Sequence, residues 1–310
     1  MLTFDTLATR TPLAFERLIP ALRQAFVDGA IVPPRHVHAI GADGEKKGTV
    51  LIMPAWNGRY LGIKTINIFP GNAARGLPGL HATYALYDAL TGVPLAQMDG
   101  NEITARRTAA ASALAASFLA RDDARHLLVL GTGRVAQLLP SAFASARRID
   151  RVSVWNHRLE GAEKLAAQWR AQGIDAQAVT GELSNAVSAA DIVSCATLAT
   201  QPLVLGAWLK PGAHLDLIGS FTPLMKEADA VAFSKSRVFV DTEEALTKAG
   251  DVLDALASGA WAADAVQATL AQLCRGERQG RQTAGENTLF KAVGTALEDL
   301  AAATLVWASR

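Results

Sequence analysis

A buried strand followed by a glycine turn lies near the middle of the chain. The apolar segment 127–130 leads directly into Gly131-Thr132-Gly133-Arg134-Val135-Ala136, and a second apolar segment, 152–155, follows after a helix-length interval. Glycines let the backbone turn tightly and approach a pyrophosphate, while the helix that opens behind them presents free N–H groups and a positive dipole end to the phosphates. Together these features predict a βαβ unit that binds a dinucleotide.

The second strand of this unit ends in Asn156-His157-Arg158, without an acid. A site for NAD usually has Asp or Glu at this point, which binds the ribose 2′-hydroxyl. A carboxylate would repel a 2′-phosphate, whereas Arg158 can pair with one through two charge-assisted hydrogen bonds. The pattern therefore favours NADPH (or NADP+) as the cofactor, with NADH bound less well. The alternative is a solvated Arg158 at a strand end.

The composition is that of a globular protein with room for two domains. Half of the 310 residues are apolar and 19% are charged, which is ordinary for an enzyme of this kind. The net charge of +1 gives no reason to expect nucleic acid or a membrane as a partner. No apolar run spans a bilayer and no signal peptide is evident, so we expect a cytoplasmic protein. Two cysteines are too few for a disulfide framework, and Cys195 is expected to be buried at a strand end.

Hydrophobic periodicity predicts an α+β region before residue 122. Apolar residues recur at helical spacing over 15–26. Strand-like segments follow at 49–54, 60–69 and 82–90, with turns at Asp43-Gly44, Asn57-Gly58 and Thr91-Gly92. Such turns are typical of an antiparallel or mixed sheet. The Ala/Ser-rich segment 104–120 predicts a closely packed helix.

A second region is typical of a Rossmann-type, doubly wound parallel sheet, because its strands alternate with helices. The six candidate strands are 127–130, 151–155, 175–179, 191–194, 214–218 and 237–240. The tail, 288–307, is apolar at helical spacing and is expected to pack back on the first region. We therefore expect a discontinuous substrate-binding and dimerisation domain, 1–122 completed by 288–310, and an NADP-binding domain, 123–287.

Several motifs together resemble the ornithine cyclodeaminase/mu-crystallin family, and the likeness runs over almost the whole chain. They are 53–56, 61–64, 98–110, the glycine turn, 155–158, 197–200 and 210–214. The resemblance implies a homodimer joined through the first domain and chemistry on a carbon–nitrogen double bond beside a carboxylate, over a nicotinamide. Known members include cyclodeaminases, reductases of cyclic ketimines, amino-acid dehydrogenases and lens crystallins. No metal is expected.

By this resemblance, Arg35, Lys64 and Arg107 bind the substrate carboxylate. Guanidinium groups suit bidentate capture of a carboxylate, and Lys64 adds a point charge. Lys64 lies inside an apolar strand, where an unpaired ammonium would be costly. Arg106 and Arg107 cannot share one helix face, and only the family pattern selects Arg107. A merely solvated Arg35 is the alternative reading of that residue.

The chain departs from the family at Phe221. Cyclodeaminases have an Asp in the segment that aligns with 219–223, where it handles the protons of the substrate amine, and phenylalanine cannot do this. Asp216, in a strand, and Glu227, expected to begin the following helix, do not occupy the matching position. We therefore favour reduction of an already cyclised substrate, whose flat ring an apolar wall would suit. Alternatively, Phe221 only packs.

The proton donor to the imine stays open between two residues. His81 aligns with a histidine of related reductases, and an imidazole can act as a general acid near neutral pH. It can equally orient a cation or a water. Three cations around one carboxylate would disfavour an iminium, so Lys64 can instead give up a proton or hold a relaying water.

The remaining expected residues surround the cofactor. Strand carboxyl ends border the crevice of a doubly wound sheet, and the family pattern adds Thr108 and the segment near the nicotinamide. The residues are Gly131, Thr132, Gly133, Arg134, Val135 and Ala136; Asn156, His157 and Arg158; Thr197 and Leu198; Ile218 and Gly219; Thr108; and Val293 and Gly294.

The leading hypothesis is NADPH-dependent reduction of Δ1-pyrroline-2-carboxylate and/or Δ1-piperideine-2-carboxylate to L-proline or L-pipecolate. Three alternatives stay open. They are an ornithine cyclodeaminase that recycles NAD, an imine-forming amino-acid dehydrogenase, and a crystallin-like protein that only binds NADPH.

Overall fold

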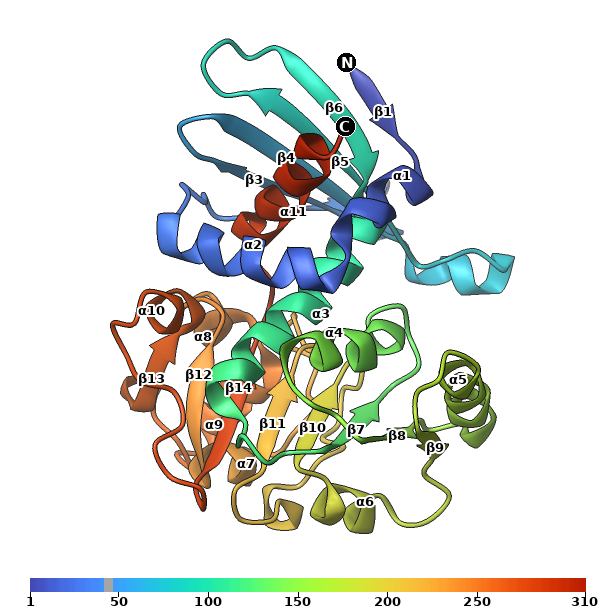
Figure 1. Cartoon of the computed structure of the whole chain (residues 1–310), viewed down its shortest axis with the longest axis vertical. Coiled ribbons are helices and arrows are strands. Elements are labelled where there is room, and N and C mark those ends of the chain that lie inside the picture. Colours follow the sequence, from blue (N-terminus) through green and yellow to red (C-terminus); the bar gives the residue numbers. More distant parts are fainter. Residues whose placement is uncertain (42–46) are drawn as a thin grey trace. The chain divides into compact units, whose positions relative to one another are not determined.

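The computed structural model describes residues 1–41 and 47–310 and divides the chain into two compact units. The first comprises Met1–Arg107 and Thr295–Arg310, and the second comprises Thr108–Gly294 (Figure 1). The sequence placed these divisions at 122/123 and 287/288. The structure places the first one inside a continuous helix, α3 (Gly100–Leu119), so that this helix contributes residues to both units.

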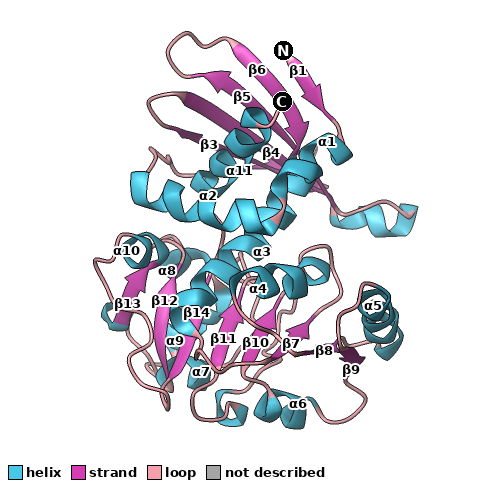
Figure 2. Ribbon diagram, viewed as in Figure 1, coloured by secondary structure: helices cyan, strands magenta, loops and turns pink. Residues whose placement is uncertain are grey.

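The first unit contains a six-stranded sheet with the order β1-β6-β5-β4-β3-β2, five of whose strands, β1 and β3 to β6, are labelled in Figure 2. Its strands are β1 (Leu2–Phe4), β2 (His36–Ile40), β3 (Gly48–Trp56), β4 (Tyr60–Ile68), β5 (Leu80–Asp88) and β6 (Pro94–Asp99). All neighbouring strands are antiparallel except β1 and β6. The predicted strands and the turns at Asn57-Gly58 and Thr91-Gly92 are confirmed; the turn predicted at Asp43-Gly44 lies outside the described residues.

Helices accompany this sheet, and one of them comes from the end of the chain. The elements are α1 (Thr6–Arg10), η1 (Thr11–Leu13), α2 (Phe15–Asp28), η2 (Pro70–Arg75) and α11 (Ala296–Ala308). The helix predicted over 15–26 is confirmed as α2, which buries Phe15, Leu18, Leu22 and Phe26 at helical spacing. Helix α11 packs against β3, β4 and α2. It therefore covers the sheet face toward which the buried residues of β3 and β4 point.

The second unit contains an eight-stranded parallel sheet with the order β13-β12-β14-β11-β10-β7-β8-β9. Its strands are β7 (His126–Leu130), β8 (Arg151–Trp155), β9 (Ala176–Ala178), β10 (Ile192–Cys195), β11 (His214–Leu217), β12 (Ser236–Val240), β13 (Val266–Thr269) and β14 (Asn287–Lys291). The six predicted strands and the doubly wound fold are confirmed. The strand order reverses between β7 and β10, which is where such sheets bind nucleotides.

Two strands, β13 and β14, were missed, and the helix predicted over 288–307 is wrong in its first part. Residues 287–291 form β14, which lies between β11 and β12, and α11 begins only at Ala296. Four of the five residues of β14 are buried although only Leu289 and Phe290 are apolar, so its sequence shows no alternation of apolar and polar residues to reveal a strand. Thr295 accepts a hydrogen bond from the backbone N–H of Leu297 and so defines where the helix starts.

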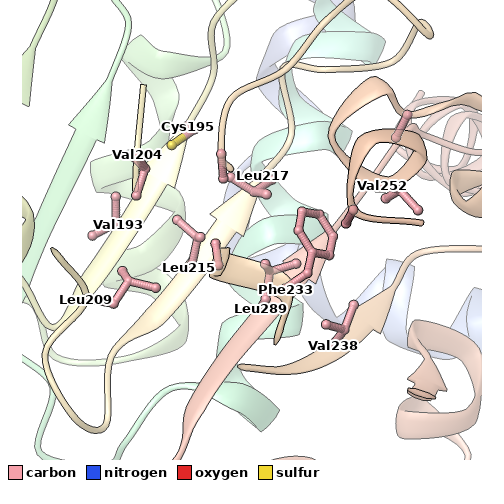
Figure 3. Close-up of a cluster of buried hydrophobic side chains, with 14 of the residues drawn as sticks. Val193, Cys195, Val204, Leu209, Leu215, Leu217, Phe233, Val238, Val252 and Leu289 are labelled. Atoms are coloured by element: carbon pink, nitrogen blue, oxygen red, sulfur yellow. The ribbon is translucent and has the colours of Figure 1, made fainter. Parts of the chain in front are cut away.

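Helices and short turns connect the strands of the second unit. They are η3 (Ala136–Leu138), α4 (Leu139–Ala146), α5 (Leu159–Ala171), α6 (Leu183–Ala189), η4 (Gly206–Trp208), α7 (Ala230–Ser234), α8 (Ala245–Lys248), α9 (Gly250–Ala257), η5 (Ala263–Ala265) and α10 (Leu270–Cys274). Figure 3 shows Val193 of β10, Leu215 of β11, Leu289 of β14 and Phe233 of α7 within one buried cluster. Cys195, also in this cluster, is a free, buried thiol at the end of β10, as expected.

Candidate active site

The two glycines of the turn after β7, Gly131 and Gly133, have different steric surroundings. Gly131 has φ +105°, and a Cβ at this residue would lie 2.6 Å from the carbonyl oxygen of Ala196. Only glycine fits there without strain. Gly133 is exposed, and a Cβ built on it would meet nothing within 4 Å. The first glycine therefore seats the turn against the end of β10, and the second leaves its outer side open for a phosphate.

The helix expected directly behind the turn begins differently from the prediction. Residues 136–138 form the 3-10 turn η3, and the α-helix α4 starts at Leu139. The backbone N–H of Leu138 donates to the carbonyl of Val135, and that of Leu139 donates to Ala136. Pro140 has no N–H to donate to the carbonyl of Ala136, which accounts for the tighter first turn.

The residues predicted to contact the adenosine directly follow β8 (Arg151–Trp155). Asn156 directly follows β8, and its side-chain amide donates to the carbonyl oxygen of Arg158 (3.0 Å). His157 and Arg158 are exposed, as is Arg134 in the glycine turn. Thr132 and Val135 are half-buried and Ala136 is buried. Three basic side chains and no acid thus occupy the turn and the end of β8 (residues 131–136 and 156–158).

The remaining predicted cofactor residues follow the strand ends farther along the sheet. Thr197 and the exposed Leu198 come after β10, and Ile218 and Gly219 come after β11. Val293 and Gly294 follow β14, where both backbone N–H groups donate to the buried carboxylate of Asp241 (2.9 and 2.6 Å). Thr108 is half-buried in α3. Because parallel strands end at one edge of a sheet, these loops share the edge that holds the glycine turn.

This set of residues fits a dinucleotide. It combines a glycine with open space beside it, a required glycine at positive φ, and basic side chains at the end of β8. Such features let the backbone approach a pyrophosphate and let a basic side chain bind a further phosphate. Among residues 1–41 and 47–310, no group of three His, Cys, Asp or Glu is arranged to hold a metal ion.

In the first unit, Lys64 and Arg107 belong to a buried cluster of opposite charges. Alternate residues of β4 are buried, and this period of two directs Lys64 to the face that α11 covers. Its ammonium lies 2.6 Å from a carboxylate oxygen of Asp299. Arg107 contacts the other oxygen of Asp299 (3.0 Å) and the carboxylate of Glu298 (2.6 Å). Burial lowers the pKa of Lys64 to about 8, while Asp299 opposes this shift.

Glu298 and Asp299 were missed by the sequence reasoning. Both are fully buried in α11, although it is otherwise an apolar helix. Charged residues are almost never buried unless they are paired. Two adjacent acids within an apolar helical segment are the signal that could have revealed them, because they require buried cations as partners.

Arg35 lies one residue before the first paired residue of β2. It precedes β2, whose first residue, His36, pairs with Ile52, and Lys64 pairs with the following residue, Met53. Continuing this register places the half-buried Arg35 in the row of Met53 and Lys64. Arg106 points elsewhere, because it pairs with Glu102 one turn earlier in α3.

His81 is not brought to Lys64. On β5 the residue opposite Lys64 is Tyr84, whereas His81 pairs with Asn67. Tyr84 lies three positions after His81 on the same strand, an odd offset, so their side chains point to opposite faces of the sheet. His81 is exposed.

Phe221 lies in the loop after β11 and is half-buried. It packs against the hydrophobic cluster of the second unit that Figure 3 shows. This contact gives the side chain a packing role, and contact with a substrate stays a prediction.

Alanine substitutions at the two glycines should have different consequences. Gly131→Ala introduces strain and overlap and should lower the free energy of unfolding by roughly 2–4 kcal/mol. Gly133→Ala should leave the thermal midpoint close to that of the wild type and weaken nicotinamide-cofactor binding, because its Cβ occupies the open space. Thermal unfolding and fluorescence titration with NADPH measure the two effects. Equal loss of stability in both variants would contradict this division of roles.

Removing one partner of the buried ion pair should destabilise the first unit strongly. Asp299→Asn leaves the Lys64 ammonium without its carboxylate, and we expect a loss of about 3–5 kcal/mol in the free energy of unfolding. The double substitution Lys64→Met with Asp299→Leu removes both charges of the pair and should recover part of this loss, because Arg107 loses its contact with Asp299 but keeps Glu298. Urea unfolding measures both. A single variant as stable as the wild type would show that the pair is not sealed from water.

Comparison with known proteins places this geometry in a family. The model of the ornithine cyclodeaminase/mu-crystallin family matches residues 8–309. The Δ1-pyrroline-2-carboxylate reductase of Paracoccus denitrificans is 40% identical over 298 residues, covering 95% of this chain and 92% of that protein.

Two solved structures share the whole fold. That of Thermococcus litoralis Δ1-pyrroline-2-carboxylate reductase with NADH and L-proline has a TM-score of 0.93 and 31% identity, covering 99% of this chain and 97% of that one. An archaeal alanine dehydrogenase dimer with bound NAD has a TM-score of 0.92 and 28% identity, covering 99% and 95%. The expected family is confirmed: the chain belongs to the ornithine cyclodeaminase/mu-crystallin family.

Proposed function

We propose that this protein is a cyclic ketimine reductase that uses NADPH to convert Δ1-pyrroline-2-carboxylate and/or Δ1-piperideine-2-carboxylate into L-proline or L-pipecolate. Relatives named for this reaction support a nicotinamide-dependent oxidoreductase acting on carbon–nitrogen double bonds. The observation that carries the proposal is the buried cluster of Lys64 and Arg107 with two carboxylates. It offers cations for a substrate carboxylate without an excess of positive charge around the imine.

The charge balance of this cluster suits an imino acid. Lys64 and Arg107 face Glu298 and Asp299, so the four buried groups have no formal net charge. Arg35 brings one further positive charge to match the substrate carboxylate. Cations alone would repel a protonated imine, whereas the two acids offset that repulsion. The acids therefore make an iminium tolerable beside the carboxylate-binding cations.

Reduction requires a hydride at the imine carbon and a proton at its nitrogen. The nicotinamide supplies the hydride when it is bound. For the proton, Lys64 has better support than His81, because its pKa is lowered to about 8 by burial and it lies within the charged cluster. His81 is exposed on the opposite sheet face. We propose Lys64 as the proton donor and Phe221 as a wall for the substrate ring.

The preference for NADPH rests on the end of β8. Residues 156–158 contain two exposed basic side chains and no carboxylate. A 2′-phosphate would find a guanidinium there, and a 2′-hydroxyl would find no acceptor acid. The related structures with NADH and NAD make this a property to be tested on this chain itself.

A homodimer formed through the first unit is supported by an apolar sheet face. Opposite the α11 side, β3, β4 and β5 present half-buried apolar residues, most of which pair with one another directly across the strands. They are Ile52, Pro54, Leu61, Ile63, Ala85 and Tyr87. A contiguous apolar patch of this kind is typical of a protein–protein contact, and a related alanine dehydrogenase is a dimer.

The substrate assignment is tested by following NADPH absorbance with three substrates in parallel. Δ1-Pyrroline-2-carboxylate or Δ1-piperideine-2-carboxylate should be reduced with one NADPH consumed per product. Pyruvate with ammonia or methylamine should be a poorer substrate, and ornithine should release no ammonia. NADPH oxidation with none of these compounds would remove the reductase proposal. Ammonia release from ornithine without net NADPH consumption would indicate a cyclodeaminase instead.

The cofactor preference is tested with Arg158→Ala. Loss of a charge-assisted contact should cost about 1.5–3 kcal/mol of NADPH affinity, or about 10- to 150-fold in Kd, with little change for NADH. Lys164→Ala removes an exposed cation from α5 and serves as the control for long-range charge. Equal catalytic efficiency of the wild type with NADH and NADPH would refute the assignment.

A further inference from the structure

The parallel pairing of β10 and β11 ends just before the predicted cofactor loops. Cys195 and Leu217 are the last paired residues, and the backbone N–H of Ile218 still donates to the carbonyl of Cys195 (3.0 Å). Beyond this point, the backbone N–H groups of Thr197 and Gly219 donate to the side-chain carboxylate of Glu227. These hydrogen bonds replace the next ones that paired strands would form.

Glu227 accepts four hydrogen bonds and is fully buried. One carboxylate oxygen accepts from the N–H (2.8 Å) and hydroxyl (2.9 Å) of Thr197, and the other accepts from the N–H groups of Gly219 (2.7 Å) and Ser220 (3.2 Å). A Cβ at Gly219 would overlap both this carboxylate and the backbone of Thr197. The sequence placed Glu227 at the start of a helix. That expectation is wrong, because Asp229 caps α7, which begins at Ala230.

Two charged groups and a thiol lie near Glu227, each from a different element. Lys291 of β14 attracts its negative charge, and Asp251 of α9 and the thiol of Cys195 in β10 also lie within electrostatic range. Lys291 itself pairs with Asp251 (3.5 Å). Burial raises the pKa of Glu227 to about 7, against the effect of Lys291 and of the donating N–H groups.

We propose that Glu227 is a positioning residue for the nicotinamide cofactor. The Glu227 carboxylate holds the loops after β10 and β11 in the conformation in which they contact the cofactor. It ties two of the predicted cofactor residues, Thr197 and Gly219, to one rigid acceptor. The glycine turn rests on the same loop, since Gly131 packs against Ala196. This inference rests on the proposed function only in requiring that a nicotinamide cofactor binds along this sheet edge.

Protonation of Glu227 would oppose this role. Each carboxylate oxygen faces two donors, so an added proton on either oxygen meets N–H groups that need an acceptor. The ionised form therefore favours the arrangement that binds cofactor. Folding responds oppositely: because the pKa is raised in the folded state, the contribution of Glu227 to stability falls as pH rises from about 4.5 to about 7. If Glu227 had only a structural role, cofactor affinity would not rise with pH over the pH range in which the contribution of Glu227 to stability falls.

The test is NADH binding to the full chain as a function of pH, without substrate. NADH is the probe because a 2′-phosphate titrates in the same range as Glu227. For the wild type, we expect Kd to rise roughly tenfold from about pH 8 to about pH 6. Glu227→Gln leaves backbone N–H groups facing an amide N–H. Its Kd for NADH at the higher pH should therefore be roughly 10- to 100-fold above that of the wild type, and it should change little with pH.

Two further variants keep the test decisive. Thr197→Val removes one donor to the carboxylate, which raises the pKa of Glu227, and so should move the midpoint of the pH dependence upward. Asp216→Asn is the matched control, because Asp216 is a buried acid in β11 with a pKa raised to about 6 by burial. Its partners are the hydroxyls of Ser112 and Ser194 and not the loops. This variant should keep the wild-type pH dependence.

A pH-independent Kd in the wild type, or a wild-type Kd and pH profile in Glu227→Gln, would overturn the role of Glu227 alone. A flattened profile in Asp216→Asn would reassign the titration to Asp216 and overturn it as well. Failure of the wild type to bind NADH and NADPH at every pH would instead refute both this inference and the proposed function.

Discussion

The burial of Lys64 and Arg107 is the constraint on which the first unit depends. A charge sealed from water is tolerated only when opposite charges and hydrogen bonds replace its hydration. Asp299 and Glu298 provide these partners, and both belong to the last helix of the chain. Helix α11 therefore does more than cover the sheet. It determines the charge of the group of side chains to which we assign the substrate.

Buried carboxylates serve a different purpose in the second unit. Beyond the last paired residues of a parallel sheet, backbone N–H groups have no strand partner and need another acceptor. Glu227 accepts from the loops after β10 and β11, and Asp241 accepts from the loop after β14. Each carboxylate fixes a loop at the edge where a doubly wound sheet binds its nucleotide. In both units, buried carboxylates that are not expected to contact a ligand thus hold in place the side chains or loops that are expected to contact it.

The chemistry that we propose needs both arrangements. A nicotinamide can deliver hydride only to a carbon held in a defined position, so rigid loops matter as much as the residues that touch the cofactor. An iminium beside a carboxylate needs cations and acids in balance. The family pattern in the sequence identified the buried cations Lys64 and Arg107 but not their acidic partners. The sequence therefore implied an excess of positive charge around the substrate.

The sequence by itself determined the local elements and the positions of the cofactor turn. Its periodicity predicted α2, β4 and six of the eight strands of the nucleotide-binding sheet, because one face of each element, or both, must be apolar. It did not reveal β14, whose buried run has no alternation. Only the tertiary structure decided that Lys64 meets Asp299, that His81 points to the other sheet face, and that Glu227 joins two strand ends. These contacts join residues far apart in the chain or depend on strand register, and a spacing rule describes only neighbours within one element.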